Sequence, residues 1–195
     1  PYRASAEALI SLGKQRNPGH LDTLLRFSKQ TGWWGWTRRG ALLGLGQSRL
    51  PEATVQLCDV AQSPREPEHI RTAGVQALAI HATWQDRGLK EKICEVLCGL
   101  CRDPIYNVRL AAGRALLSAG DRRHVHVLEA LCTQLAVQDI PSISRGIARL
   151  GPESDISRSR ALEDTVSRLS ERLKKLENRI EDLQSEKLDL SPDDS

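Results

Sequence analysis

Three closely spaced cysteines are the residues of this chain with the clearest capacity for chemistry. Cys94, Cys98 and Cys101 form a C-x3-C-x2-C pattern. Thiolates at such spacing can hold a zinc ion or an iron–sulfur cluster, and His124 or His126 could add a nitrogen ligand to a structural zinc site. Whether they do so depends on the element that carries the thiols and on the direction in which it points them.

The cysteine triplet falls within a stretch of helical periodicity, at positions i, i+4 and i+7. These positions share one face of a helix, so we predict buried thiols that pack as small apolar groups, with a structural metal site as the alternative. The spacing resembles the iron–sulfur ligand motif of radical S-adenosylmethionine enzymes. In those enzymes, however, the motif lies in a loop after a barrel strand, and no βα repeat is evident here.

Other catalytic signatures are missing from the printed sequence. It contains no H-E-x-x-H, no G-x-S-x-G and no Walker loop. His124 and His126 stand two residues apart, and such side chains do not face each other on a helix, so we expect them on the surface. We therefore predict no catalytic, cofactor-binding or metal-binding residue and no enzymatic activity in this chain.

Three tryptophans and two arginines gather within residues 33–39. Tryptophan and arginine are favoured anchors at protein interfaces, yet tryptophan is also usually well buried. Two interpretations follow. Trp36 could pack between neighbouring helical units while Trp33 and Trp34 cover the turn, or Trp33, Trp34 and Arg39 could bind a partner protein.

A recurring arginine marks the beginning of the helices that are expected along the chain. It heads successive Ala/Gly/Leu-rich stretches with gaps of 35, 33, 38 and 36 residues, at Arg3, Arg38, Arg71, Arg109 and Arg145. Repetition at such a period predicts an all-α fold, an αα-superhelical solenoid. Helix pairs are expected at 2–13 with 20–30, 36–46 with 51–62, 67–83 with 89–102 and 104–119 with 123–137, followed by a shorter helix at 140–150.

The recurring arginines are expected to be structural. A guanidinium at the head of a stacked helix can bind carbonyls or acids of the preceding repeat, because it offers several donors in a fixed geometry. We predict an inter-repeat ladder of Arg38, Arg71, Asp103 and Arg109. Asp103 is also expected to cap a helix that starts at Pro104.

Small residues follow each arginine at matched places, among them Gly40, Gly74 and Gly113. Small side chains allow helices to approach closely. We therefore expect these glycines at contacts between the first helices of successive repeats.

Residues 103–116 carry a recognisable motif. They read D-P-I-Y-N-V-R-L-A-A-G-R-A-L, which resembles the HEAT-repeat signature D-P-x-x-x-V-R-x-A-A-x-x-A-L, and residues 70–78 match its second half. The resemblance covers residues 1–150 and implies a scaffold or binding platform for other proteins.

A narrower resemblance rests on motif order: Y-R-x-x-A, then G-W-W-G-W-T-R-R-G-A-L, then I-R-x-x-G, then D-P-x-x-x-V-R. This order resembles the C-terminal HEAT-like region of bacterial gluzincin zinc aminopeptidases of the leucyl/alanyl type. The resemblance implies, as an alternative function, an accessory domain of a metalloaminopeptidase whose zinc site lies in a separate upstream catalytic domain. It carries no catalytic residue onto this chain.

The periodicity changes after residue 154. Apolar residues then recur at heptad spacing, which predicts a coiled-coil helix over 155–190 after a HEAT-like domain at 1–152, with a disordered acidic tail at 191–195. A long helix packed on its own solenoid is the alternative. The predicted seam comprises Leu162, Val166, Leu169, Leu173, Leu176, Ile180 and Leu183.

Charge and composition limit the classes of partner that the chain is expected to bind. Residues 1–154 have 20 basic and 14 acidic side chains, and residues 155–195 have 8 and 11. The basic excess lacks a dense Lys/Arg stripe, so we do not expect a nucleic acid as the partner. No apolar run approaches the roughly 20 residues that span a bilayer. Five cysteines on apolar faces suggest reduced thiols.

We predict a cytoplasmic, non-catalytic protein-interaction module that forms a homodimer through its coiled coil and binds no cofactor.

Overall fold

Helices account for all the regular secondary structure in the described part of the chain. The computed structural model describes residues 2–30, 35–150, 169–170 and 172–174. The chain divides into two units, Pro1–Gly151 and Pro152–Ser195. None of the described helices combines the length and apolar character that crossing a bilayer requires.

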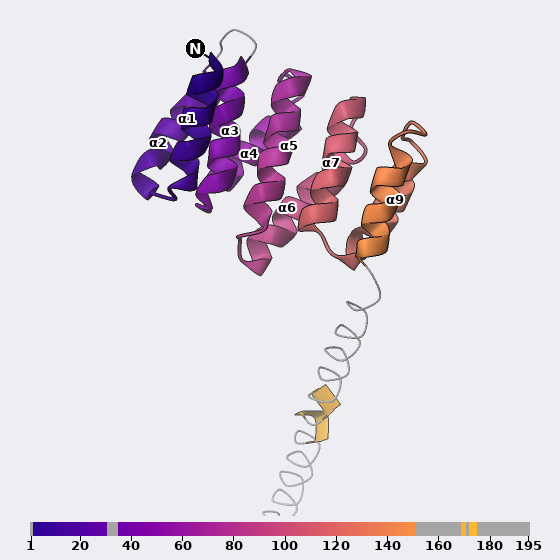
Figure 1. Ribbon diagram of the computed structural model, residues 1–195. Helices are drawn as coiled ribbons and strands as arrows, with labels where there is room; N and C mark the ends of the chain where they lie inside the picture. Colours follow the sequence, from indigo (N-terminus) through magenta and orange to yellow (C-terminus); the bar gives the residue numbers. More distant parts are fainter. Residues whose placement is uncertain (1, 31–34, 151–168, 171, 175–195) are drawn as a thin grey trace, which may run out of the picture. The chain divides into compact units, whose positions relative to one another are not determined.

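The helices of the first unit form two layers (Figure 1). The first layer holds the odd-numbered helices, which lie side by side in chain order, each against the next: α1 (Tyr2–Lys14), α3 (Trp36–Ser48), α5 (Glu68–Ala82), α7 (Tyr106–Ala119) and α9 (Ile140–Arg149). The second layer holds the even-numbered ones: α2 (Leu21–Ser28), α4 (Ala53–Gln62), α6 (Arg87–Leu100) and α8 (Val125–Cys132). Short 3-10 turns η1 (Pro18–His20) and η3 (Arg122–His124) precede α2 and α8.

One apolar core runs between the two layers. It is built almost entirely from aliphatic side chains, as a sequence with a single Phe requires. Because such side chains interlock at close range, each helix of one layer is fixed by neighbours in both layers. The largest fully buried side chains are Leu24, Leu42, Leu45, Leu57, Ile70, Leu78, Ile93, Leu97, Leu116, Leu128, Leu131 and Ile143.

Glycines set the spacing between α1 and α3. A Cβ added to Gly13 would lie 2.0 Å from the carbonyl oxygen of Gly44, and one added to Gly40 would lie 2.5 Å from Cα of Ala6. Any side chain at either position would therefore force the two helices apart. Gly40 thus lies at a contact between first helices, as the sequence predicted.

The other two matched glycines face the second layer instead. A Cβ on Gly74 would meet the backbone of Ala61 in α4, and one on Gly113 would meet Leu131 in α8. The sequence predicted both glycines at contacts between successive first helices, and for Gly74 this prediction is wrong, because the position faces α4. Gly113 lies at both kinds of contact, since its Cβ would also lie 3.5 Å from Ile143 of the first-layer helix α9.

The start of α7 also differs from the prediction. The helix begins at Tyr106, and Asp103-Pro104 form a turn before it, in which Asp103 Oδ1 accepts the N–H of Ile105 at 2.9 Å. Asp103 is therefore not the N-cap of a helix starting at Pro104. Its carboxylate is engaged elsewhere, as described next.

Candidate functional site

Arg38 and Arg71 occupy equivalent places in α3 and α5 and bind in the same way. Each Nε donates to a carbonyl near the end of the preceding second-layer helix: Arg38 to Ser28 at 2.6 Å and Arg71 to Ala61 at 3.0 Å. In both cases the acceptor lies ten residues earlier. We call this arrangement, together with the acid described below, the arginine clamp.

The acid of each clamp lies in the turn before the next first-layer helix. Arg38 donates to both oxygens of Glu66, at 2.7 and 2.6 Å, and Arg71 donates to both oxygens of Asp103. Carbonyls or acids of the preceding repeat were the expected partners, and the carbonyl contacts agree with that expectation. The acids differ from it, because each carboxylate comes from the turn that follows the clamp arginine and not from a preceding segment.

Arg109 in α7 departs from the clamp. Its guanidinium donates to the main-chain oxygens of Asp103 and Pro104, at 2.7 and 3.1 Å. Its Nε is buried and has no hydrogen-bond partner among the described residues. Asp139, in the place of the clamp acid, instead accepts from the Tyr106 hydroxyl at 2.6 Å, which raises the pKa of that phenol, and from Arg114 at 3.3 Å.

A groove of about 630 Å³ lies on the first layer where α5 and α7 run side by side. Its floor and walls carry small and short polar side chains: Thr72, Gln76, Ala79, Ala111, Ala115 and Ser118. Asn107 donates to Glu68 across one end, and Arg114 lines the groove as well. Short side chains leave room for the side chains of another molecule, and the charged groups give its rim polarity.

A second groove of about 410 Å³ lies on α1 and α3. It shares Leu43 with the first. The Arg3 guanidinium lies 5.2 Å from the ring centre of Trp36, a cation–π contact, and Arg39 is exposed beside it. Trp33 and Trp34, which were predicted to bind a partner together with Arg39, lie outside the described residues.

Cys94 and Cys98 lie on α6 as expected, whereas Cys101 is the residue that caps its C-terminal end, and the three thiols differ in exposure. Cys94 and Cys101 are buried, and the Cys94 thiol lies 3.7 Å from the carbonyl oxygen of Ala119. Cys98 is half-buried. Burial raises the pKa of all three thiols, and that of Cys101 to about 12, so they are protonated near neutral pH.

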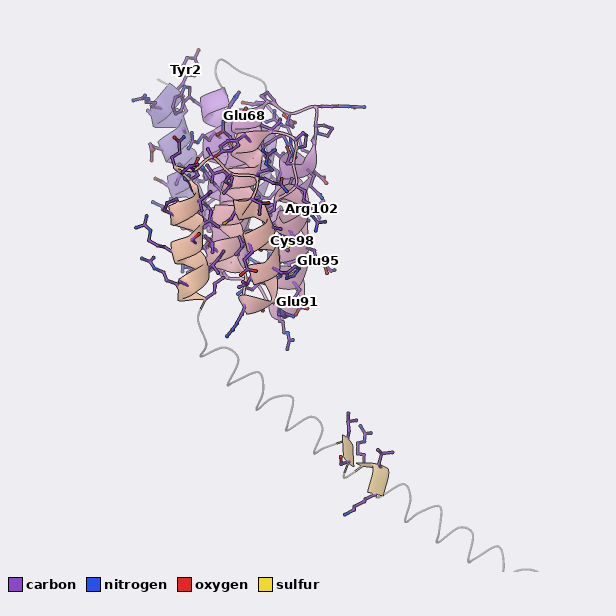
Figure 2. The ribbon with its side chains drawn as sticks, turned by 90° about the vertical axis from the view of Figure 1, so that its right-hand side faces the viewer. Tyr2, Glu68, Glu91, Glu95, Cys98 and Arg102 are labelled. Carbon is purple, nitrogen blue, oxygen red and sulfur yellow. The ribbon has the colours of Figure 1, made fainter. Side chains whose placement is uncertain are left out.

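Cys98 lines a third groove, of about 680 Å³, between α6 and α8. Glu91, Glu95 and Cys98 follow one another along one side of α6, and Arg102 continues the row just after the helix ends (Figure 2). His124 and His126 also line this groove. Within the described ranges, no three His, Cys, Asp or Glu side chains are arranged to hold a metal ion.

His81 is a buried polar residue that the sequence showed only as an isolated histidine. Its Nε2 lies 2.9 Å from the Thr54 hydroxyl of α4, and it is fully enclosed. Burial lowers its pKa to about 4, so the imidazole is neutral. Its partner stands 27 residues away in the chain, and no local pattern links them.

Two members of the predicted coiled-coil seam are described, Leu169 and Leu173. Residues 169–170 and 172–174 are helical, and the two leucines are 56% and 60% exposed. The remaining seam residues lie outside the described part: Leu162, Val166, Leu176, Ile180 and Leu183.

Comparison with known proteins identifies no family. No family model matches the chain, and no curated protein matches it. One solved structure that it resembles is the crystal structure of an engineered protein determined by the Northeast Structural Genomics Consortium. The two chains are 16% identical with a TM-score of 0.49, over 74% of this chain and 70% of that one. A similarity at this level indicates neither family nor function.

Proposed function

We propose that this chain is a non-catalytic protein-interaction module: a HEAT-like αα solenoid that presents its first layer to a partner and self-associates through a coiled coil. The observation that carries the proposal is the open first-layer surface with its two grooves, which meet at Leu43. Stacked helical repeats characteristically bind partners along such extended surfaces.

Three features support the solenoid assignment. Recurring arginines mark a period of 33–38 residues. Helices of the first layer contact one another in chain order, as expected when each repeat packs on the next. The clamps of Arg38 and Arg71 repeat the same carbonyl-and-acid geometry at two successive boundaries.

The groove between α5 and α7 suits a helix or an extended segment of another protein. Ala79, Ala111 and Ala115 leave space for inserted apolar side chains, whereas Glu68 and Arg114 can meet polar groups at the rim. An apolar centre with a polar edge is the usual composition of an interface that forms between separately folded proteins.

The decisive variant places a large charged side chain in this groove. Ala111→Arg would occupy it, and Val55→Arg would add the same side chain to α4, where Val55 is 69% exposed. Proteins captured by the wild-type chain would be identified by mass spectrometry, and each candidate then titrated in purified form by calorimetry. We expect at least one partner whose affinity falls more than about tenfold with Ala111→Arg and is unchanged with Val55→Arg. Purified partners that all bind both variants equally would contradict the proposal.

Self-association is supported by the exposure of Leu169 and Leu173. They stand four residues apart on helical backbone, at consecutive seam positions, and present large apolar surfaces to solvent. Pairing with a second copy would bury them, as it does the alternating apolar positions of a heptad repeat.

Light scattering during size exclusion tests this part of the proposal. We expect a mass near twice 21.6 kDa for the full chain. The double variant Leu169→Glu/Leu173→Glu should be monomeric, because buried charges at the seam are costly. Ser170→Glu, which adds a charge beside the seam, should stay dimeric. A monomeric wild-type chain across the accessible concentration range would contradict the coiled-coil proposal.

A further inference from the structure

Two arginines adopt a left-handed backbone conformation at equivalent helix ends. Arg16 follows α1 with φ 55°, and Arg49 follows α3 with φ 63°. Apart from these two, no described residue other than glycine has a positive φ. Helices commonly end in this conformation, but glycine is the usual occupant because it has no Cβ to clash. Arginine at both places puts two positive charges where the backbone favours a small neutral residue.

The two guanidinium groups belong to one patch. The contact between Gly13 and Gly44 holds the last turns of α1 and α3 together, and Arg16 and Arg49 lie shortly beyond these glycines. Desolvation and the positive charge of Arg16 both lower the pKa of Arg49. The packing of α1 on α3 thus places both arginines at the same end of the first layer.

An exposed tryptophan completes the patch. The Arg49 guanidinium carbon lies 3.1 Å from the ring centre of Trp84, which is 53% exposed at the end of α5. Gln85 donates to the carbonyl oxygen of Arg49 at 3.1 Å and so fixes the backbone of that residue. A guanidinium stacked on a ring keeps its N–H groups directed outward in the plane, available to an acceptor.

No acid of the described residues neutralises the patch. Neither Arg16 nor Arg49 has an ion pair with any carboxylate in the described part of the chain. Asp86, which follows soon after Trp84, uses its carboxylate to cap α6 through the N–H of Leu89. The patch therefore places positive charge that no described carboxylate compensates beside an exposed apolar ring.

We propose that Arg16, Arg49 and Trp84 form a docking site for an acidic peptide segment of a partner protein, in which a carboxylate binds the guanidinium groups and an adjacent apolar side chain packs on the indole. Charge complementarity carries the choice of ligand, because residues 1–154 have 20 basic and 14 acidic side chains. The docking site is distinct from the first-layer grooves and does not depend on their function.

A peptide is favoured over a nucleic acid by the size of the patch. Nucleic-acid surfaces carry many cations along a stripe, since affinity comes from neutralising successive phosphates. Here only the Arg49 guanidinium lies over the ring of Trp84, and Arg16 follows the end of the neighbouring helix α1. Glu52 and Asp86, close in sequence to Arg49 and Trp84, are exposed. Such an arrangement suits one or two carboxylates next to an apolar residue.

The test uses the full chain and a fluorescein-labelled peptide, Glu-Asp-Leu-Glu-Phe-Asp-Glu-Leu, with binding followed by fluorescence anisotropy. Arg49→Gly removes the guanidinium and suits the left-handed backbone, so the variant should fold. Its affinity is expected to fall at least about tenfold, and that of Trp84→Ala similarly. Arg65→Gly removes the same charge from an exposed position in the turn before α5 and should change the affinity less than about twofold.

Three outcomes would overturn the proposal. The first is the absence of peptide binding by the wild-type chain at millimolar concentration. The second is an equal effect of Arg49→Gly and Arg65→Gly, which would show attraction by overall charge. The third is tighter binding of an eight-residue oligothymidylate with the same dependence on Arg49, which would assign the site to phosphate. Thermal unfolding of each variant by circular dichroism establishes that it is folded.

Discussion

Arg71 of α5 and Asp103 of the α6–α7 turn form a two-contact ion pair that is almost completely enclosed, with side chains 3% and 8% exposed. The same guanidinium holds the carbonyl oxygen of Ala61. Three segments of the chain that are far apart in sequence thus meet at one side chain. Because the pair is buried, breaking it should cost more than breaking an exposed ion pair of the described residues.

Removing the charge of Asp103 should therefore be costly. Asp103→Asn keeps an oxygen that can accept from Ile105 but leaves Arg71 buried without a counter-charge. We expect the free energy of unfolding to fall by about 3–5 kcal/mol, measured by urea denaturation followed by circular dichroism. Arg87→Gln, in an ion pair whose arginine is 86% exposed, should cost less than about 1 kcal/mol. An equal loss of unfolding free energy in the two variants would contradict the special importance of the buried Arg71–Asp103 pair.

The buried His81 predicts sensitivity to acid. Its pKa is about 4 in the folded chain against an ordinary 6.5, because burial disfavours the charged imidazole. Between these values the unfolded chain binds a proton that the folded chain does not, so stability is full above pH 6.5 and declines as the pH falls toward 4. The slope is about 1.36 kcal/mol per pH unit, or about 3 kcal/mol over the interval.

Urea denaturation at successive pH values would measure this slope. His81→Gln should be less stable than the wild type at pH 7, because the packing of the buried imidazole is lost. Its free energy of unfolding should, however, fall less steeply between pH 6.5 and 4. His126→Gln, at an exposed position, should follow the wild type. Identical pH dependence of His81→Gln and the wild type would show that another group is responsible.

Substitution of glycine by alanine should have opposite effects on stability at Gly13, in the contact between α1 and α3, and at Gly99 on α6. Gly13→Ala would put a methyl group 2.0 Å from the Gly44 carbonyl oxygen, so we expect a loss of about 1–3 kcal/mol or more. Gly99→Ala on α6 meets no atom within 4 Å and should stabilise the chain by about 0.5–1 kcal/mol through reduced backbone entropy in the unfolded state. Thermal unfolding measures both, and a neutral Gly13→Ala would mean that the helices separate freely.

The cysteines are expected to react in two groups with a thiol reagent such as dithiobisnitrobenzoate. Cys94 and Cys101 are buried with raised pKa values, and burial raises the pKa of Cys58 to about 11, so these three should react slowly in the folded chain at pH 8, whereas the half-buried Cys98 and Cys132 should react sooner. In urea all five cysteines should react alike. A rapid release of five equivalents from the folded chain would contradict the burial described for Cys94 and Cys101.

Most helices could be anticipated from the sequence because their signals are local. Apolar periodicity and turn residues predicted a helix over residues 67–83, and the structure has helix α5 at Glu68–Ala82. The start of α7 was misplaced because Asp103-Pro104 has the form of a cap. The carboxylate is instead drawn into the turn by Ile105 and bound by Arg71.

The partners of the candidate site were harder to anticipate because they depend on the fold. Arg38 and Arg71 use different acids at different distances along the chain, Glu66 after 28 residues and Asp103 after 32. Loop length differs between the two boundaries, so no fixed offset connects arginine to acid. Arg49 and Trp84 likewise meet only because α3 and α5 end side by side.

The departure of Arg109 from the clamp has a consequence for the order in which the structure opens. The first two boundaries between successive helix pairs are held by arginine clamps, whereas at the third Asp139 binds Tyr106 and the largely exposed Arg114. Local unfolding follows the weakest boundary. Under heat or mechanical tension, helices α8 and α9 should therefore detach as a unit and re-form while α1–α7 stay folded, with amide exchange that is fastest in α8 and α9.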